Sequence, residues 1–97
     1  MPHRIAPRAE RDLDEIWLYV ARQSSSIEIA NRLVDGIADR FLTIASFPQI
    51  GRPRREFGAA SRSFAIGEYV IIYCLEGDDV LILRVVHGRR DLENLST

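Results

Sequence analysis

The sequence predicts a two-layer α+β protein in which a helical hairpin packs on one face of a mainly antiparallel sheet, in the order β-α-α-β-β-β. Two stretches before residue 48 carry apolar residues at the spacing of helix turns. Three apolar runs follow a polar connection, and turn residues separate them. The length of 97 residues is that of one small domain, so we expect a single domain over 1–97.

The first two elements are a short strand and a helix. Residues 2–6 are expected to form the strand, which ends at Pro7 because proline suits the first turn of a helix. The helix has an apolar stripe opposed by charged residues. The stripe consists of Ala9, Leu13, Ile16, Trp17 and Val20. Leu18 falls on the far side of this helix, so we interpret it as a candidate contact with another protein.

The second helix is expected to begin at a capping box. The segment Ser25-Ser-Ile-Glu28 has the required form, in which the first serine and the glutamate each satisfy a backbone N–H group. An apolar stripe then persists over four turns, and Pro48 ends the helix. The stripe consists of Ala30, Leu33, Val34, Ile37, Phe41, Ile44 and Ala45. The two helices therefore predict a hairpin with one shared apolar side.

Three strands, at 61–66, 69–75 and 80–86, are expected to form an antiparallel meander, because hairpin-length turns join them. The second and third runs are nearly continuously apolar, which predicts that both faces of the sheet are at least partly hidden from water. One hairpin covers only one face. We therefore infer that another polypeptide closes the opposite face.

The charge pattern limits the chemistry. The net charge is -1, but all 13 basic residues are arginine, which does not act as a general base at working pH. Between Arg52 and Arg62 there are four arginines and a single acid, Glu56, which makes this connection locally basic. No membrane-length apolar run and no signal-peptide core are present, so a cytoplasmic protein is expected.

Few residues have the spacing of a chemical site. The single cysteine, Cys74, excludes an intramolecular disulfide, and the two histidines share no ligand spacing with it, so we expect no metal and no cofactor. Arg84 stands alone in an apolar strand. It must pair with a carboxylate, reach the sheet edge or face a groove that binds an anion.

The segment from His87 to Asp91 gathers an imidazole, two guanidinium groups and a carboxylate where the chain leaves the sheet. One interpretation is a solvated polar tail in which the arginines pair with nearby acids. In the alternative, Glu56 and His87 act as base and acid around a phosphate held by Arg62, which is the minimum set for metal-free RNA cleavage.

Four segments together resemble the ParE branch of the RelE/ParE toxins of bacterial toxin–antitoxin systems. They are Asp12-Leu-Asp-Glu-Ile16, Phe47-Pro-x-x-Gly-Arg-Pro53, Arg62-Ser-Phe-x-Ile-Gly-x-Tyr69-Val-Ile-Ile-Tyr73 and Ile82-Leu-Arg-Val-Val-His-Gly-Arg-Arg-Asp91. The resemblance spans almost the whole chain. It implies a RelE-like fold, poisoning of DNA gyrase without catalysis, and neutralisation by a ParD-type antitoxin whose flexible segment wraps the toxin.

The resemblance also implies roles for particular residues. Antitoxin contacts are expected at Leu18, Arg62, Tyr73 and Arg84, and contacts to the target at His87, Arg89 and Arg90. One alternative is a RelE-like, ribosome-dependent mRNA endoribonuclease. Its catalytic residues would be Glu56, Arg62, His87 and Arg90. A second alternative is an inactive remnant that only binds an antitoxin. No tyrosine follows Tyr73, so the RelE-type site is incomplete and the ParE branch is favoured.

Overall fold

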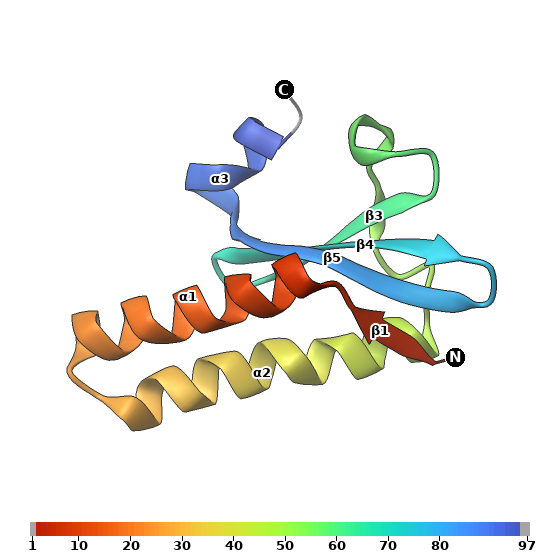
Figure 1. Ribbon diagram of the computed structural model, residues 1–97. Helices are drawn as coiled ribbons and strands as arrows, with labels where there is room; N and C mark the ends of the chain where they lie inside the picture. The colour runs from red at the N-terminus through yellow and green to blue at the C-terminus, as the bar shows by residue number, and fades with distance from the viewer. Residues whose placement is uncertain (1, 96–97) are drawn as a thin grey trace.

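The computed structural model describes residues 2–95, and the side chains of residues 2–92. Its elements in chain order are β1 (His3–Ile5), α1 (Pro7–Ser24), α2 (Ile27–Ser46), β2 (Arg52–Pro53), the 3-10 turn η1 (Arg55–Phe57), β3 (Ser61–Ile66), β4 (Tyr69–Glu76), β5 (Asp79–His87) and α3 (Gly88–Leu95). The predicted α+β class is confirmed. Figure 1 shows α1 and α2 on one side of the sheet, with α3 and the segment around η1 on the other.

The sheet has five strands in the order β1-β5-β4-β3-β2. The three predicted strands form the expected antiparallel meander, and β1 pairs parallel to β5. Glycines with positive φ lie in both hairpin turns, at Gly67 and Gly77, where residues with a side chain are strained. The two-residue strand β2 was not predicted, because it lies within the polar connection and pairs only with Arg62 and Ser63 of β3.

The predicted cap of the second helix is wrong by one residue. Ser25 adopts a left-handed conformation (φ 54°) that ends α1. Ser26 is therefore the first extended residue, and its Oγ accepts a hydrogen bond from the Ile29 backbone N–H at 3.1 Å. The hairpin is further joined by a hydrogen bond of 2.7 Å from the Trp17 ring N–H to Asn31.

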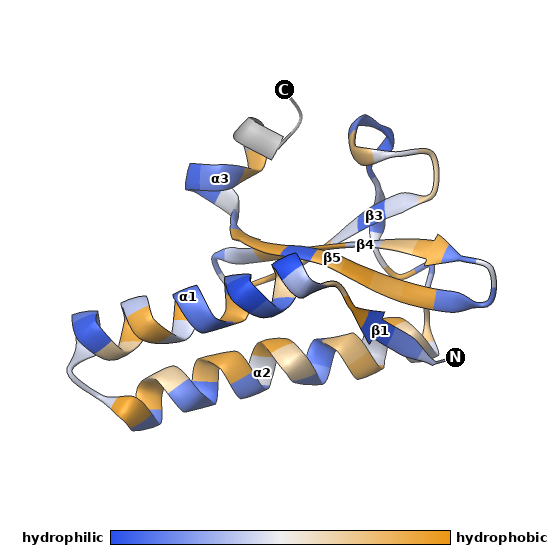
Figure 2. Ribbon diagram, in the orientation of Figure 1, coloured by the Kyte–Doolittle hydropathy of each residue, from blue (hydrophilic) through white to orange (hydrophobic). Residues whose placement is uncertain are grey.

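The core lies between the hairpin and the sheet, and Figure 2 shows apolar segments of both helices and of the central strands. Its buried residues are Ala9, Ile37, Phe41, Ile44, Tyr69, Ile71, Tyr73, Val80, Ile82 and Val85. The predicted stripes supply the helical members, because residues at helical spacing share one face.

The opposite face of the sheet is partly covered by the chain itself, so the premise that nothing in the chain remains to cover it is wrong. Ile71 and Val85 face the hairpin, so their neighbours Ile72 and Val86 point to the other face, yet these are only 2% and 3% exposed. The helix α3 contacts β4 and β5, and Gly88 at its start lies against Val70. The segment interpreted as a polar tail is thus a helix that lies against the sheet.

Within the part of the chain that the structure describes, no helix has both the length and the apolar character that crossing a bilayer requires.

Candidate functional site

A hollow lies between α1, the edge of β5 and the start of α3. Its volume is about 400 Å³, and we call it the α1–β5 groove. Charged residues from all three elements line it together with Ile16, Tyr19 and Tyr69. The groove exists because β1 is short. It pairs with β5 only as far as Ile82, and no described strand lies beside the remainder of that edge.

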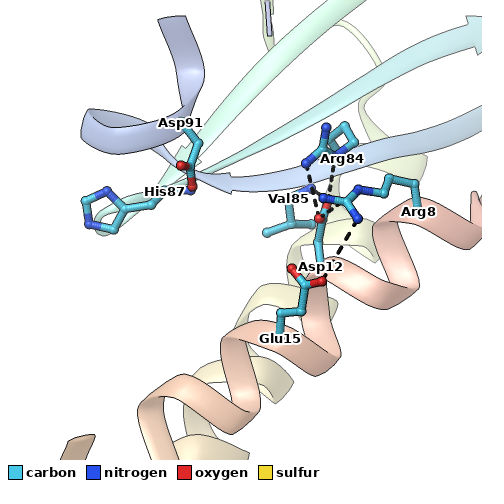
Figure 3. Close-up of polar contacts among 7 residues, drawn as sticks. All are labelled: Arg8, Asp12, Glu15, Arg84, Val85, His87 and Asp91. Carbon is cyan, nitrogen blue, oxygen red and sulfur yellow. Dashed lines mark hydrogen bonds and ion pairs between the residues drawn. The ribbon is translucent and has the colours of Figure 1, made fainter. Parts of the chain in front are cut away.

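At this edge, the side chain of Asp12 accepts a backbone hydrogen bond that a neighbouring strand would otherwise accept. Its carboxylate accepts a hydrogen bond of 2.9 Å from the Val85 backbone N–H (Figure 3). The same carboxylate accepts two hydrogen bonds from Arg84, at 2.8 and 3.3 Å, and lies 3.5 Å from Nε of Arg8. Asp12 is only 4% exposed, so these partners compensate for its loss of water.

This geometry confirms the carboxylate partner among the three alternatives left open for Arg84, and it also places Arg84 beside the groove at the sheet edge. Arg84 pairs with a carboxylate, and that carboxylate comes from α1 across 72 positions of sequence. The sequence did not identify Asp12 as the partner of Arg84, because Asp12 is one of several acidic residues in the first helix. The available signal was the lone arginine in an apolar strand, which requires an acidic partner without identifying it.

His87 and Asp91 fasten the start of α3. The His87 Nδ1 accepts from the Arg90 backbone N–H, and the Asp91 carboxylate accepts from the His87 backbone N–H, both at 3.4 Å. The His87 ring also stands edge-on to Tyr69, with 5.5 Å between ring centroids. Burial raises the pKa of Tyr69. The His87 imidazole is therefore engaged in structure.

The two predicted target arginines of α3 have different surroundings. The Arg90 guanidinium lies 5.3 Å from the centroid of the Tyr19 ring, which is a cation–π distance and ties α3 to α1. Arg89 is exposed to solvent. On α1, the candidate contact Leu18 is 44% exposed, which is consistent with its predicted position on the far side of the helix.

Tyr73 and Arg62 hold the connection after α2. The buried Tyr73 hydroxyl donates to the Pro48 carbonyl at 2.6 Å and accepts from the Gly51 N–H at 2.9 Å. Burial raises the pKa of Tyr73. Nη1 of Arg62 donates to the Gly51 carbonyl at 2.6 Å. Both side chains thus have intramolecular roles at the end of the sheet that lies away from α3.

Two residues of the alternative ribonuclease site, Arg62 and His87, do not converge. In the register of the sheet, His87 of β5 is level with Ile66 of β3, and β3 lies two strands away from β5. Ile66 in turn lies four residues from Arg62 along β3. These separations place the two backbones about 16 Å apart. Glu56 lies on η1 and pairs with Arg54 at 3.6 Å. Among the described residues, no group of three or more potential metal ligands comes together either.

Known proteins resemble this chain over most of its length. A family model described as ParE toxin of type II toxin-antitoxin system, parDE, matches residues 4–92. Two curated relatives come from Caulobacter vibrioides. Toxin ParE3 is 31% identical over 84% of this chain and 80% of its own length, and Toxin ParE1 is 35% identical over 89% and 88%.

Two solved structures share the fold. A chain from the chromosomal ParDE TA system of P. aeruginosa superposes with a TM-score of 0.78, covering 90% of this chain and 95% of its own, at 19% identity. A chain of the toxin-antitoxin complex RelBE2 from Mycobacterium tuberculosis gives a TM-score of 0.67, covering 89% and 95%, at 24% identity. The fold is therefore that of the RelE/ParE toxins.

The chain is a toxin of a type II toxin–antitoxin system, since the family model covers nearly all of it. Within that class it belongs to the ParE family, to which both curated relatives also belong.

Proposed function

We propose that this protein inhibits DNA gyrase and that a ParD-type antitoxin neutralises it. Membership of the ParE family supports the proposal, because the description of that family names a toxin encoded with an antitoxin in parDE systems. The observation that carries the choice of target is the separation of Arg62 from His87 by two strands and four residues of register. A ribonuclease needs an acid, a base and a phosphate-binding group around one bond. A gyrase inhibitor needs only a binding surface.

The target-binding surface is the start of α3, with His87, Arg89 and Arg90. The capping contacts of His87 and Asp91 fix the direction of this helix. Both arginines are exposed, but Arg90 is held against Tyr19, so Arg89 is the arginine chosen to test contact with the target.

Four residues are assigned to antitoxin binding, Leu18, Arg62, Tyr73 and Arg84, but Tyr73 is fully buried and cannot contact the antitoxin itself. Leu18 is exposed on α1, and Arg84 lines the α1–β5 groove, so these two contact the antitoxin directly. Tyr73 and Arg62 contribute indirectly, because their hydrogen bonds fix the conformation of the connection at residues 48–51.

A supercoiling assay with purified toxin and bacterial gyrases tests the target. We expect the wild-type protein to inhibit supercoiling and the variant Arg89→Glu to lose most of that inhibition. Arg11→Glu is the matched control, because Arg11 is also an exposed helical arginine but lies on α1. Unaffected supercoiling, together with cut mRNA in a translation extract, would overturn the proposal in favour of a ribonuclease.

A second experiment removes the acid–base chemistry without disturbing the fold. The variant Glu56→Gln lacks the base that this chemistry requires, and Glu56 lies on η1, outside the target-binding surface at the start of α3. We expect growth inhibition to persist when this variant is expressed without antitoxin. Loss of toxicity in a variant with wild-type thermal stability would contradict a purely binding mechanism. An unaffected gyrase, intact mRNA and no growth inhibition by the wild type would instead indicate an inactive remnant.

A further inference from the structure

Positive charge is concentrated in one segment of the chain. Residues 40–67 contain five arginines and one acidic residue, whereas the rest of the chain contains eight arginines and thirteen acidic residues. The segment therefore has a net charge of +4 in a protein whose net charge is -1. It covers the end of α2 together with β2, η1 and β3. Such a separation of charge indicates a surface for a negatively charged partner.

Four of these arginines lie along the edge strand β2, and we call them the arginine rim. They are Arg52, Arg54, Arg55 and Arg62. The strand β2 is the last of the sheet, so no described strand lies beyond it. Arg52 is level with Ser63, and Pro53 is level with Arg62. Residues that are level in an antiparallel pair share a face of the sheet, and successive residues alternate. Arg52 and Arg62 therefore lie on opposite faces, and the rim is basic on both.

Two arginines of the rim are oriented without being neutralised. Nε of Arg54 donates to the Ser63 hydroxyl at 2.8 Å, and Nη1 of Arg62 donates to the Gly51 carbonyl at 2.6 Å. These acceptors carry no charge, so both guanidinium groups keep theirs. Glu56 is the single acidic residue of the segment. It lies 3.6 Å from Nη1 of Arg54 and its side chain is 47% exposed, so this ion pair offsets little of the charge.

The other two arginines of the rim are available to a ligand. Arg52 and Arg55 are exposed, and their side chains have no partner within the part of the chain that the structure describes. A guanidinium group binds a phosphate through two parallel hydrogen bonds. The rim thus combines two free guanidinium groups with two whose side chains are already ordered, which lowers the entropy lost on binding.

We infer that the arginine rim binds the sugar–phosphate backbone of double-stranded DNA. The choice of DNA rests on the proposed target, because gyrase acts on DNA. Contacts to phosphates do not read the base sequence, so binding is expected to be independent of sequence. The segment around η1 lies on the same side of the sheet as α3 (Figure 1), so one complex allows α3 to contact the enzyme and the rim to contact its DNA.

The rim fits a duplex better than a single strand of RNA. Single strands are bound largely by stacking of bases on aromatic side chains. The elements of the rim contain two aromatic residues, Phe57 and Phe64, and both are half-buried. Arginines on both faces of one sheet edge instead match a groove that has phosphates on its two sides. The major groove of B-DNA, about 12 Å wide, admits a β-ribbon.

The test measures binding of purified toxin to a fluorescent DNA duplex of about two helical turns, by anisotropy between about 50 and 200 mM salt. We expect the logarithm of the wild-type binding constant to fall with the logarithm of salt concentration, with a slope of about -2 to -4. Arg52→Gln and Arg55→Gln should each weaken binding about 5- to 15-fold at the lowest salt and reduce the slope by about 1. Arg32→Gln is the control, because Arg32 is exposed on α2 outside the basic segment, and it should change affinity less than about twofold.

The same variants separate this inference from the proposed function. Both rim substitutions replace exposed, unpaired side chains, so they should keep the wild-type melting temperature. A wild type that does not bind the duplex at the lowest salt, or wild-type affinity in both Arg52→Gln and Arg55→Gln, overturns the rim even if supercoiling is inhibited. A single-stranded RNA of the same length that binds the rim more tightly than the duplex overturns the choice of DNA. A wild type that binds DNA through the rim and leaves gyrase unaffected overturns the proposed target instead.

Discussion

At the residue scale, one hydroxyl group fixes the connection between the helical layer and the sheet. Tyr73→Phe removes the donor to the partly buried Pro48 carbonyl and the acceptor of the buried Gly51 N–H. We expect a loss of about 1–3 kcal/mol of unfolding free energy. Urea denaturation measures it, with Tyr19→Phe as the control because the Tyr19 side chain is half exposed. Equal stability of the two variants would show that the Tyr73 hydroxyl contributes nothing.

The same buried hydroxyl predicts a dependence of stability on alkaline pH. Burial raises the pKa of Tyr69, Tyr73 and Cys74, so the folded protein keeps these protons to higher pH than the unfolded chain does. Their contribution is complete below the ordinary values of 9.0 for Cys and 10.0 for Tyr, and it is lost as the pH rises through the folded pKa values. We expect the urea midpoint to fall between about pH 8 and about pH 11, and to fall less in Tyr73→Phe. A midpoint that stays constant over this range would contradict the prediction.

At the element scale, two glycines respond in opposite ways to alanine. Gly36 lies inside α2 with no atom within 4 Å of an added Cβ, so Gly36→Ala should stabilise the protein by about 0.5–1 kcal/mol through helix propensity. An added Cβ on Gly51 would lie 2.9 Å from the Ser63 carbonyl and would also overlap Tyr73. Gly51→Ala should therefore lower the melting temperature while Gly36→Ala raises it. Similar melting temperatures for the two variants would contradict the packing described for Gly51.

Asp12 joins α1 to β5, and its replacement tests that junction. Asp12→Ala removes the acceptor of the Val85 N–H and leaves Arg84 without its buried partner, for an expected loss of about 3–5 kcal/mol. Asp12→Asn keeps an acceptor and should lose less. Asp14→Asn is the control, because Asp14 is an exposed residue of the same helix. Thermal denaturation that ranked Asp12→Ala with Asp14→Asn would show that the junction does not hold the two layers together.

The elements differ in how far the sequence could predict them. The helices and the meander were predicted because their apolar periodicity is local, and the core stripes of α2 follow it. The helix α3 was missed because its first four residues are glycine, two arginines and aspartate, and because a histidine supplies the cap. The Asp12–Arg84 pair was also missed, since periodicity carries no information on contacts separated by 72 positions.

At the scale of the whole molecule, the cover of the second sheet face decides how truncation experiments are interpreted. Removing residues 88–97 should expose the parts of β4 and β5 that α3 contacts, including Val70, and lower the unfolding free energy by about 2 kcal/mol or more. Such a loss corresponds to a fall of roughly 8–16 °C in the melting temperature of a chain this size. Differential scanning calorimetry of the truncated and full-length proteins measures it.

Loss of toxicity on truncation would then have two causes, a weakened fold and a missing target contact. Arg89→Glu separates them, because Arg89 is exposed and its replacement should leave the melting temperature nearly unchanged. We expect Arg89→Glu to lose toxicity at wild-type stability, and the truncated chain to lose both. If the truncated chain kept the wild-type melting temperature, α3 would not cover the sheet, and the second face would again require a partner chain to exclude water.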